Sequence, residues 1–543
     1  MLSIKKSRLV SMIFILVGLL MTTRIYAAEP ASFQQGLDAL AQNTFEQVES
    51  GVGLIAQSGD ERADQVLNLL LNGDLYVQKK TDVLVTVRDK QGSKSDIVAL
   101  FAPQQAQAET VSSRSIRKIA INNQLRGLLR SELASLNLSH RDPDVRAEAI
   151  KQLLGTLDAG MYQRLQQRLT VEGDDTVQDL LSVALAIYDL KNSSDSARQS
   201  AAISTLGDSY QPQARIALNS FVAGPHSDVL LSEANKALGM IAQRASLAEM
   251  SETLFFGLSL GSVLVLSAIG LAITFGVMGV INMAHGELMM LGAYTTYVVQ
   301  TLMPDHIGWS LVVSIPLAFL VAGAVGILIE RSVIRFLYGR PLETLLATFG
   351  ISLILQQTVR TIFSPLNRSV ATPEWMQGVI EINPLLSLTL NRLYIIGFCL
   401  AVFALLFMAL RYTRLGIEVR AVSQNRSMAR AMGVRSDWVD AMTFGLGSGI
   451  AGIAGVALSQ LTNVGPNLGQ SYIIDSFMVV VFGGVGNLWG TLVAGMSLGI
   501  VNKVLEPWAG AVLAKILVLV FIILFIQKKP RGLFPQKGRS AEG

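Results

Sequence analysis

The chain has 543 residues, of which 51% are hydrophobic and only 15% are charged, and its mean hydropathy is +0.45. Soluble domains carry about 25% charged residues, so this composition excludes an ordinary water-soluble enzyme. The net charge of +4 is too small to indicate a nucleic-acid partner. A single cysteine, Cys399, excludes an intramolecular disulfide and a cysteine metal site, and four scattered histidines favour no metal site either.

The first 28 residues have the order of a secretory signal peptide. A basic start at Lys5, Lys6 and Arg8 precedes an apolar run over 9–20, and Ala27 offers a cleavage position. An apolar helix over this run would be roughly 18 Å long, short of the bilayer core of about 30 Å. The alternative is an uncleaved anchor helix. Both interpretations predict export of the segment that follows.

Residues 29–250 predict an exported, mostly helical domain. Alternating apolar residues within 75–100 predict a β-hairpin, with Val83, Val85 and Val87 on one face and a turn at 90–92. From residue 141, helix starts recur at Asp142–Pro143, Asp175 and Gln211–Pro212, each followed by a second helix over 160–170, 195–206 and 228–242. This spacing resembles HEAT-type helical repeats, and the alternative is an irregular helical bundle. No motif for chemistry is found in this domain, which leaves protein contact, docking of a substrate receptor or stabilisation of the membrane domain from outside as its expected roles.

Residues 251–528 predict a polytopic α-helical membrane domain, so the lipid bilayer is an expected partner. Nine apolar segments are expected to span the membrane, over 253–281, 286–303, 309–330, 342–363, 392–411, 437–461, 472–484, 489–506 and 510–527. Small residues four apart, such as Gly445 with Gly449 and Gly447 with Ala451, predict close helix packing. The fold class is therefore mainly α.

Loop charges predict the orientation of the spans. Segments 331–340 and 411–436 and the tail 529–543 are rich in arginine and lysine, whereas 364–391 has one basic residue. Because basic loops stay in the cytoplasm, we expect the tail to be cytoplasmic and residues 29–250 to be periplasmic. Nine spans after an exported domain end on the cytoplasmic side, which agrees with the basic tail.

A polar break interrupts the apolar stretch near residue 282. Asn282, His285 and Glu287 lie where the first two expected spans meet, and ionisable groups within an apolar stretch favour a functional interpretation. A neutral polar solute could exchange water for the amide, the imidazole and the carboxylate of these residues. The alternative is a cytoplasmic-side turn in which the same groups cap two helices.

A basic segment over 411–436 predicts an amphipathic cytoplasmic helix. Ala421, Asn425, Met428 and Met432 fall near one face of that helix, and Gly433 is a natural stop. Such a helix could dock in a groove of a partner protein. The alternative is a helix that lies on anionic lipid.

Four stretches in a fixed order carry a family resemblance. They are LAITFGVMGVINMAHGELMMLGAY (271–294), RAVSQNRSMARAMGV (420–434), VVVFGGVGNLWGTLVAG (479–495) and KPRGLFP (529–535). Together they resemble ABC-importer permeases of the branched-chain amino acid type, over about 252–540. The resemblance implies a second related permease subunit, two ABC ATPase subunits and a periplasmic solute-binding protein as partners, and it implies the bacterial inner membrane.

The same resemblance assigns the loop 420–434 to the coupling helix, which docks in an ATPase cleft. Its expected contact residues are Arg420, Ala421, Gln424, Asn425, Met428, Ala429, Met432 and Gly433. The long N-terminal domain departs from amino acid permeases and resembles the extended permease subunit of urea importers. The expected function is therefore urea import by alternating access, without catalysis or a cofactor.

Other functions fit parts of the sequence. The chain lacks the phosphate-binding motif G-x-x-x-x-G-K-[ST], so in an ATP-driven importer the nucleotide would bind to partner subunits. The first alternative is an importer of branched-chain amino acids or short amides, which needs groups for a charged carboxylate and ammonium. The second is a passive urea or amide channel that needs no ATPase. The third is a membrane-anchored scaffold without solute flux.

Overall fold

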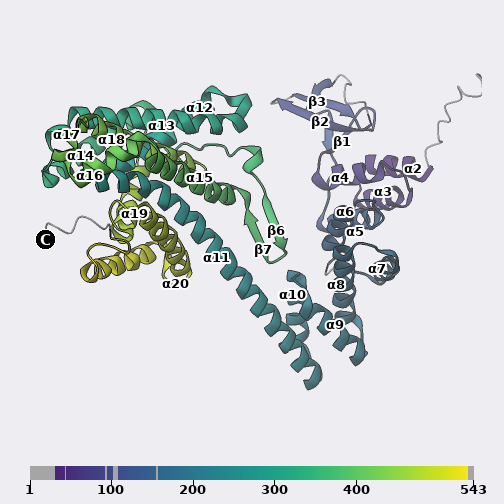
Figure 1. The fold of residues 1–543 in the computed structure, drawn as a ribbon. Coiled ribbons are helices and arrows are strands. Elements are labelled where there is room, and N and C mark those ends of the chain that lie inside the picture. Colours follow the sequence, from purple (N-terminus) through teal and green to yellow (C-terminus); the bar gives the residue numbers. More distant parts are fainter. Residues whose placement is uncertain (1–30, 43, 92–93, 102–107, 155–156, 536–543) are drawn as a thin grey trace, which may run out of the picture. The chain divides into compact units, whose positions relative to one another are not determined.

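A computed structural model describes residues 31–42, 44–91, 94–101, 108–154 and 157–535. It divides into two compact units, Met1–Ala242 and Gln243–Gly543, each of which is described by itself (Figure 1). The predicted signal peptide over 1–28 lies outside the described residues. The predicted domain limits at 250 and 528 stay predictions.

The first part of unit 1 combines helices with an antiparallel sheet. Four helices, α2, α3, α4 and α5, enclose an apolar core with the inner sheet residues Leu75, Val77 and Leu84. The sheet order is β4-β3-β2-β1-β5. The bounds are α2 (Ala31–Ala41), α3 (Phe45–Gln57), α4 (Ala63–Asn72), β1 (Leu75–Gln78), β2 (Val83–Gln91), β3 (Lys94–Ala99), β4 (Glu109–Ser112), β5 (Ile116–Lys118) and α5 (Asn123–Asn137).

The predicted hairpin is confirmed, because β2 and β3 pair in antiparallel register. Val83, Val85 and Val87 alternate along β2, as predicted, but they differ in burial: Val85 is buried, whereas Val83 is exposed. The other three strands were not predicted, and they correct the interpretation of this domain as helical with a single hairpin. β1, β4 and β5 have only three or four residues each, too few for a clear apolar alternation.

The second part of unit 1 is helical and begins where the sequence predicts. Asp142 caps the first helix through its carboxylate, with Pro143 at the first helical position, and Pro212 starts another helix in the same way. A single apolar core joins these helices with the first turns of α11. The HEAT-type repeat stays a prediction. The bounds are α6 (Pro143–Leu153), α7 (Ala159–Val171), α8 (Asp175–Asn192), α9 (Ser196–Asp208) and α10 (Pro212–Val222).

A buried ion cluster centred on Glu172 joins α6, α7 and α8. Its carboxylate accepts two hydrogen bonds from Arg146, at 2.9 and 2.7 Å, and two from Arg168. The backbone N–H groups of Gly173 and Asp174 also donate to it. Burial alone would raise the pKa of Glu172, but the hydrogen bonds from Arg146 and Arg168 outweigh it and lower the pKa from 4.5 to about 2.

Replacing Glu172 by Gln should destabilise this junction by about 2 kcal/mol, because two guanidinium groups lose a charged acceptor. Hydrogen exchange of α6 and α7 in the full-length protein in detergent measures the effect. Since folding lowers the pKa of Glu172, its stabilisation is complete above pH 4.5 and is lost as the pH falls towards 2. The variant should lack this pH step. Glu148→Gln is the control, because Glu148 is exposed and pairs with Lys151 at 3.8 Å. Equal protection in both variants would contradict the assignment.

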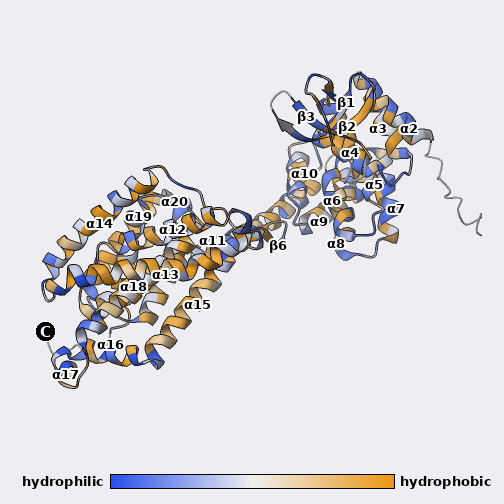
Figure 2. Ribbon diagram, turned by 90° about the horizontal axis from the view of Figure 1, so that it is seen from above, coloured by the Kyte–Doolittle hydropathy of each residue, from blue (hydrophilic) through white to orange (hydrophobic). Residues whose placement is uncertain are grey.

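Unit 2 is a bundle of apolar helices, seen as mostly orange ribbons in Figure 2. Its bounds are α11 (Asp228–Met278, which begins in unit 1), α12 (His285–Leu302), η1 (Pro304–His306), α13 (Ile307–Ser332), η2 (Ile334–Phe336), α14 (Pro341–Phe363), η3 (Glu374–Met376), β6 (Val379–Asn383), β7 (Leu386–Thr389), α15 (Leu390–Tyr412), α16 (Arg414–Gln424), α17 (Arg426–Ala431), α18 (Ser436–Ser459), α19 (Leu468–Gly483) and α20 (Leu488–Lys528).

Six helices in the described part of the chain are long and apolar enough to cross a membrane. The predicted number of nine is therefore not confirmed. Two of the predicted segments form α12, which starts with polar residues, and α19, which has only 16 residues. Two others are merged in α20, whose backbone turns at Gly510 with φ +76°. The sequence located the apolar segments but could not tell full spans from shorter helices.

Small residues bring the central helices of unit 2 into backbone contact. On α18, Gly447 faces Gly270 of α11, Gly452 faces Gly292 of α12 and Ala318 of α13, and Gly445 and Gly449 face α13. The predicted packing role of these glycines is confirmed. Because α18 touches three helices in this way, it fixes the position of the polar break between α11 and α12.

Candidate functional site

The polar break separates α11 from α12 in the interior of unit 2. Residues 279–284 are not helical, and Gly279 starts the break with φ +68°. Asn282, His285 and Glu287 are all buried, with exposed fractions of 1%, 0% and 1%. The sequence therefore located a buried cluster of polar groups correctly, and its contacts distinguish the roles that each residue could play.

Asn282 and His285 brace the backbone. The Asn282 side-chain oxygen accepts from the N–H of Ala284, two residues on, at 3.0 Å and so closes a turn within the break. His285 Nε2 lies 2.8 Å from the carbonyl oxygen of Ser267 on α11. Because a carbonyl oxygen only accepts, we assign the proton to Nε2, which leaves Nδ1 as an acceptor. Neither contact caps a helix end, because Asn282 bonds to the residue before α12 and Ser267 lies in the interior of α11. Nδ2 of Asn282 and Nδ1 of His285 have no hydrogen-bond partner among the described residues.

Glu287 faces a different neighbour. Its Oε1 accepts from the hydroxyl of Ser352 on α14 at 3.2 Å. Its Oε2 is buried and has no partner within the part of the chain that the structure describes. The three predicted residues thus share one helix start but do not converge on one point, because His285 contacts α11 and Glu287 contacts α14. Of the three residues, Glu287 is the one that combines a hydrogen bond from a polar side chain, Ser352, with a carboxylate oxygen, Oε2, that has no partner among the described residues.

Sequence reasoning missed a polar stripe along α14. Thr344, Thr348, Ser352 and Gln356 follow one another at intervals of four and are all buried. Other faces of α14 are apolar and exposed, for example at Leu346 and Ile354. The signal was present in the sequence, because polar residues four apart lie on one face of a helix. A search for isolated charged groups does not detect it.

A second break, over 460–467, precedes α19. Gln356 of α14 donates to Asn467 Oδ1 at 3.0 Å and to the carbonyl of Pro466 at 3.3 Å. The half-buried Arg360 donates to the same Asn467 oxygen at 2.7 Å. Gly469 in the first turn of α19 packs directly on Gly286 in the first turn of α12. Two helix N-termini, each with a partial positive charge, therefore meet beside the polar stripe and Glu287.

Replacing Gly286 by Ala should destabilise the permease unit, because the carbonyl of Gly469 occupies the place of the new methyl group. Overpacking of this kind costs about 1–3 kcal/mol, which corresponds to a fall in melting temperature of roughly 5 °C. Thermal unfolding in detergent measures it. Gly350→Ala is the control, because no atom lies within 4 Å of a methyl group at that helical position. Unfolding temperatures that agree between the two variants would refute the close contact.

The predicted coupling helix is not one helix. The chain forms α16 and α17, and Asn425 separates them by capping α17 through a hydrogen bond from Met428 N at 3.0 Å. The prediction of a continuous amphipathic helix is wrong because an asparagine side chain stabilises a new helix start better than a helix interior. The predicted stop at Gly433 is confirmed, since α17 ends at Ala431 and Gly433 has φ +89°.

The eight residues assigned to coupling divide into buried and exposed groups. Ala429 is buried and Ala421 half-buried, and both belong to a small apolar cluster with Val419, Val422 and Val439. The guanidinium of Arg420 donates to the carbonyl of Leu410 at the end of α15. Arg420 is exposed, and so are the remaining residues: Gln424, Asn425, Met428, Met432 and Gly433.

Charged side chains tie α17 to the membrane helices. Arg426 pairs with the buried Asp440 of α18 and stacks on the ring of Tyr338 at 3.7 Å. Arg430 binds Asp437 at 2.9 Å and Ser436 at 2.5 Å. A displacement of α17 would therefore act directly on the first turns of α18.

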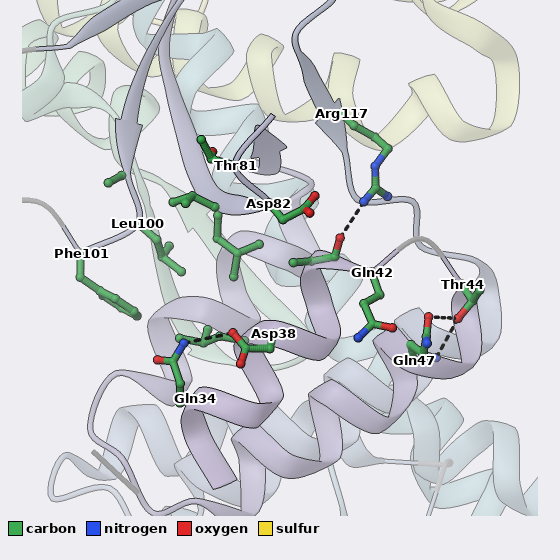
Figure 3. A pocket seen from close by; sticks show the side chains of 15 residues that line it. Gln34, Asp38, Gln42, Thr44, Gln47, Thr81, Asp82, Leu100, Phe101 and Arg117 are labelled. Carbon is green, nitrogen blue, oxygen red and sulfur yellow. Dashed lines mark hydrogen bonds between the residues drawn. The ribbon is translucent and has the colours of Figure 1, made fainter. Parts of the chain in front are cut away.

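Unit 1 has a hollow of about 1160 Å³ that the sequence did not predict (Figure 3). It lies between α2, α3 and the sheet, with polar groups such as Gln34, Asp38 and Gln47 at its rim. The guanidinium of Arg117 donates to the carbonyl of Ala41 at 2.8 Å and so holds the end of α2 against β5. These contacts explain the structure of the hollow but indicate no chemistry.

Comparison with known proteins identifies the membrane unit. The family model of the branched-chain amino acid transport system permease component matches residues 253–526, about half of the chain. The chain belongs to this family. The high-affinity branched-chain amino acid transport system permease protein LivH of Escherichia coli K12 is 32% identical over 295 residues, which cover 52% of this chain and 94% of that protein. BraD of Pseudomonas aeruginosa, with the same description, is 28% identical over 51% of this chain and 93% of its own length.

A more distant relative has another solute in its name. The ribose import permease protein RbsC of Escherichia coli K12 is 26% identical over 30% of this chain and 46% of that protein. No solved structure matches the chain. The relatives are permease subunits of transport systems, not enzymes. About half of this chain, including all of unit 1, lies outside the family match.

Proposed function

We propose that the chain is the membrane subunit of an ATP-driven importer for urea. In this proposal it pairs with a second related permease, two ATPase subunits and a periplasmic solute-binding protein in the bacterial inner membrane. Residues 29–250 lie in the periplasm and the tail 529–543 in the cytoplasm. Family membership supports the transport role, and the N-terminal half outside the family match supports a specialised member.

The single observation that carries the choice of a neutral solute is the charge balance at the break. The starts of α12 and α19 contribute a partial positive charge of about half an elementary charge each, and the carboxylate of Glu287 offsets their sum. Beside α14, Glu287 Oε2 is an acceptor that has no hydrogen-bond partner among the residues that the structure describes. Urea has N–H donors for this acceptor and carries no net charge.

Branched-chain amino acids are the second candidate, because LivH and BraD bear their name. A solute carboxylate needs a cation. The guanidinium of Arg360 is a cation close to this site, because it donates a hydrogen bond to Asn467. An amino acid importer should therefore depend on Arg360, whereas a urea importer should tolerate Arg360→Gln. This variant separates the two candidates on the same complex.

The decisive test is uptake of labelled urea and leucine by the full complex in proteoliposomes. We expect ATP-dependent urea uptake and about a tenfold loss in Glu287→Gln, because the amide weakens an acceptor for the solute. Glu343→Gln is the matched control, since Glu343 is exposed at the start of α14 and pairs with Arg340 at 3.1 Å. Uptake of leucine in place of urea would refute the proposed solute, and urea uptake without ATP would refute the importer.

The proposal also assigns coupling to the exposed surface of α17 and of the turn that follows it. Met432 is 80% exposed, so Met432→Glu should leave the fold intact while a buried charge disrupts ATPase docking. We expect transport to fall at least tenfold relative to ATP hydrolysis. Leu302→Glu at the far end of α12 is the control, with a similar exposed fraction of 76%. Equal transport per ATP in both variants would count against the coupling role.

A further inference from the structure

The polar stripe on α14 contains two kinds of residue. The hydroxyl groups of Thr344 and Thr348 bond to backbone groups. Thr344 donates to carbonyls of α14 or just before it, and Thr348 donates to the carbonyls of Leu345 and Ile281 and accepts from the N–H of Met283. Ser352 and Gln356 instead donate to side chains of other segments, namely to Glu287 and to Asn467 in the break before α19. Burying polar side chains of this kind inside a membrane helix costs free energy. The groups that they bind therefore indicate where a functional site lies.

Ser352 and Gln356 connect the two helix starts. Ser352 contacts the first turn of α12, and Gln356, one turn or about 6 Å further along α14, contacts Asn467 just before α19. The two helix starts touch each other at Gly286 and Gly469. A solute that enters between α14 and these starts would meet Glu287 Oε2, which has no partner among the described residues, and the amide of Gln356.

We infer that the face of α14 formed by Ser352 and Gln356, together with Glu287, is a binding site for small neutral amides in the transport path. This inference rests on the proposed function and assigns the specificity-determining contact within it. An N–H group of the solute donates to Glu287 Oε2. The solute carbonyl accepts from Gln356 Nε2, which gives up its hydrogen bond to Asn467.

In this site Glu287 binds the N–H group of an amide and Gln356 binds its carbonyl oxygen. Gln356 is a specificity-determining residue, because its N–H donor distinguishes a carbonyl oxygen from a weaker acceptor such as sulfur. Ser352 positions Glu287 and has no role in that distinction. Removal of the two side chains should therefore have different effects on solute choice, which separates binding from a merely structural role.

The test compares urea and thiourea uptake at saturating concentration by the full complex in proteoliposomes. The same binding protein serves every variant, so its own preference cancels when urea-to-thiourea ratios are compared. We expect Gln356→Leu to reduce the ratio about tenfold while ATP hydrolysis stimulated by the binding protein persists. Ser352→Ala should lower uptake of both solutes alike and keep the ratio.

Gln357→Leu is the matched control, because Gln357 is the neighbouring glutamine on the exposed side of α14. It should leave both uptake and the ratio unchanged. An unaltered ratio in Gln356→Leu, with normal urea uptake by the unmodified complex, overturns this inference alone. Failure of the unmodified complex to import urea overturns the proposed function and the inference with it. If Gln356→Leu does not assemble, Gln356→Glu, which removes the N–H donor but keeps the size, must show the reduced ratio; an unchanged ratio overturns the inference.

Discussion

The bilayer interior offers no water to hydrogen-bond with, and unit 2 contains two breaks in its helices that need such bonds. The break over 279–284 and the break over 460–467 both leave backbone and side-chain groups that only protein can satisfy. Side chains of α14 supply some of these hydrogen bonds to each of the two breaks. Thr348 donates to the carbonyl of Ile281 at 3.3 Å and accepts from the N–H of Met283, and Gln356 donates to Pro466. The position of α14 is therefore fixed by the breaks as much as by its apolar contacts.

This constraint explains why polar and small residues occur together in the centre of the unit. Helices can exchange polar groups only if their backbones approach closely, and glycine allows that approach between α12, α18 and α19. The close approach also places two helix starts in contact, where their partial charges add. A carboxylate at Glu287 is then electrostatically favourable in a place where it would otherwise be costly. The close helix packing at the glycines thus accounts both for the stability of the site and for its polarity.

The sequence predicted what depends on local chemistry. The helix starts at Asp142 and Pro212 follow from caps and prolines within a few residues, and the polar break near residue 282 follows from three polar groups in an apolar run. It could not predict contacts between distant segments. Ser352 reaches Glu287 across 65 positions and Gln356 reaches Asn467 across 111 positions, and nothing in either local pattern identifies its partner. The short strands β4 and β5 depend on their neighbours in the same way.

α18 relates the coupling region to the polar break. At its start, Asp440 pairs with Arg426 of α17. Further along, Gly447 rests on α11 and Gly455 rests on the backbone of α12 at Met289, four residues after His285. A helix transmits displacement along its axis because its backbone bonds are internal, and close packing leaves no space to absorb it. In the proposed mechanism, movement of α17 by an ATPase would therefore reach the start of α12 through α18. It would change the contact between Gly286 and Gly469, and with it the access of a solute to Glu287.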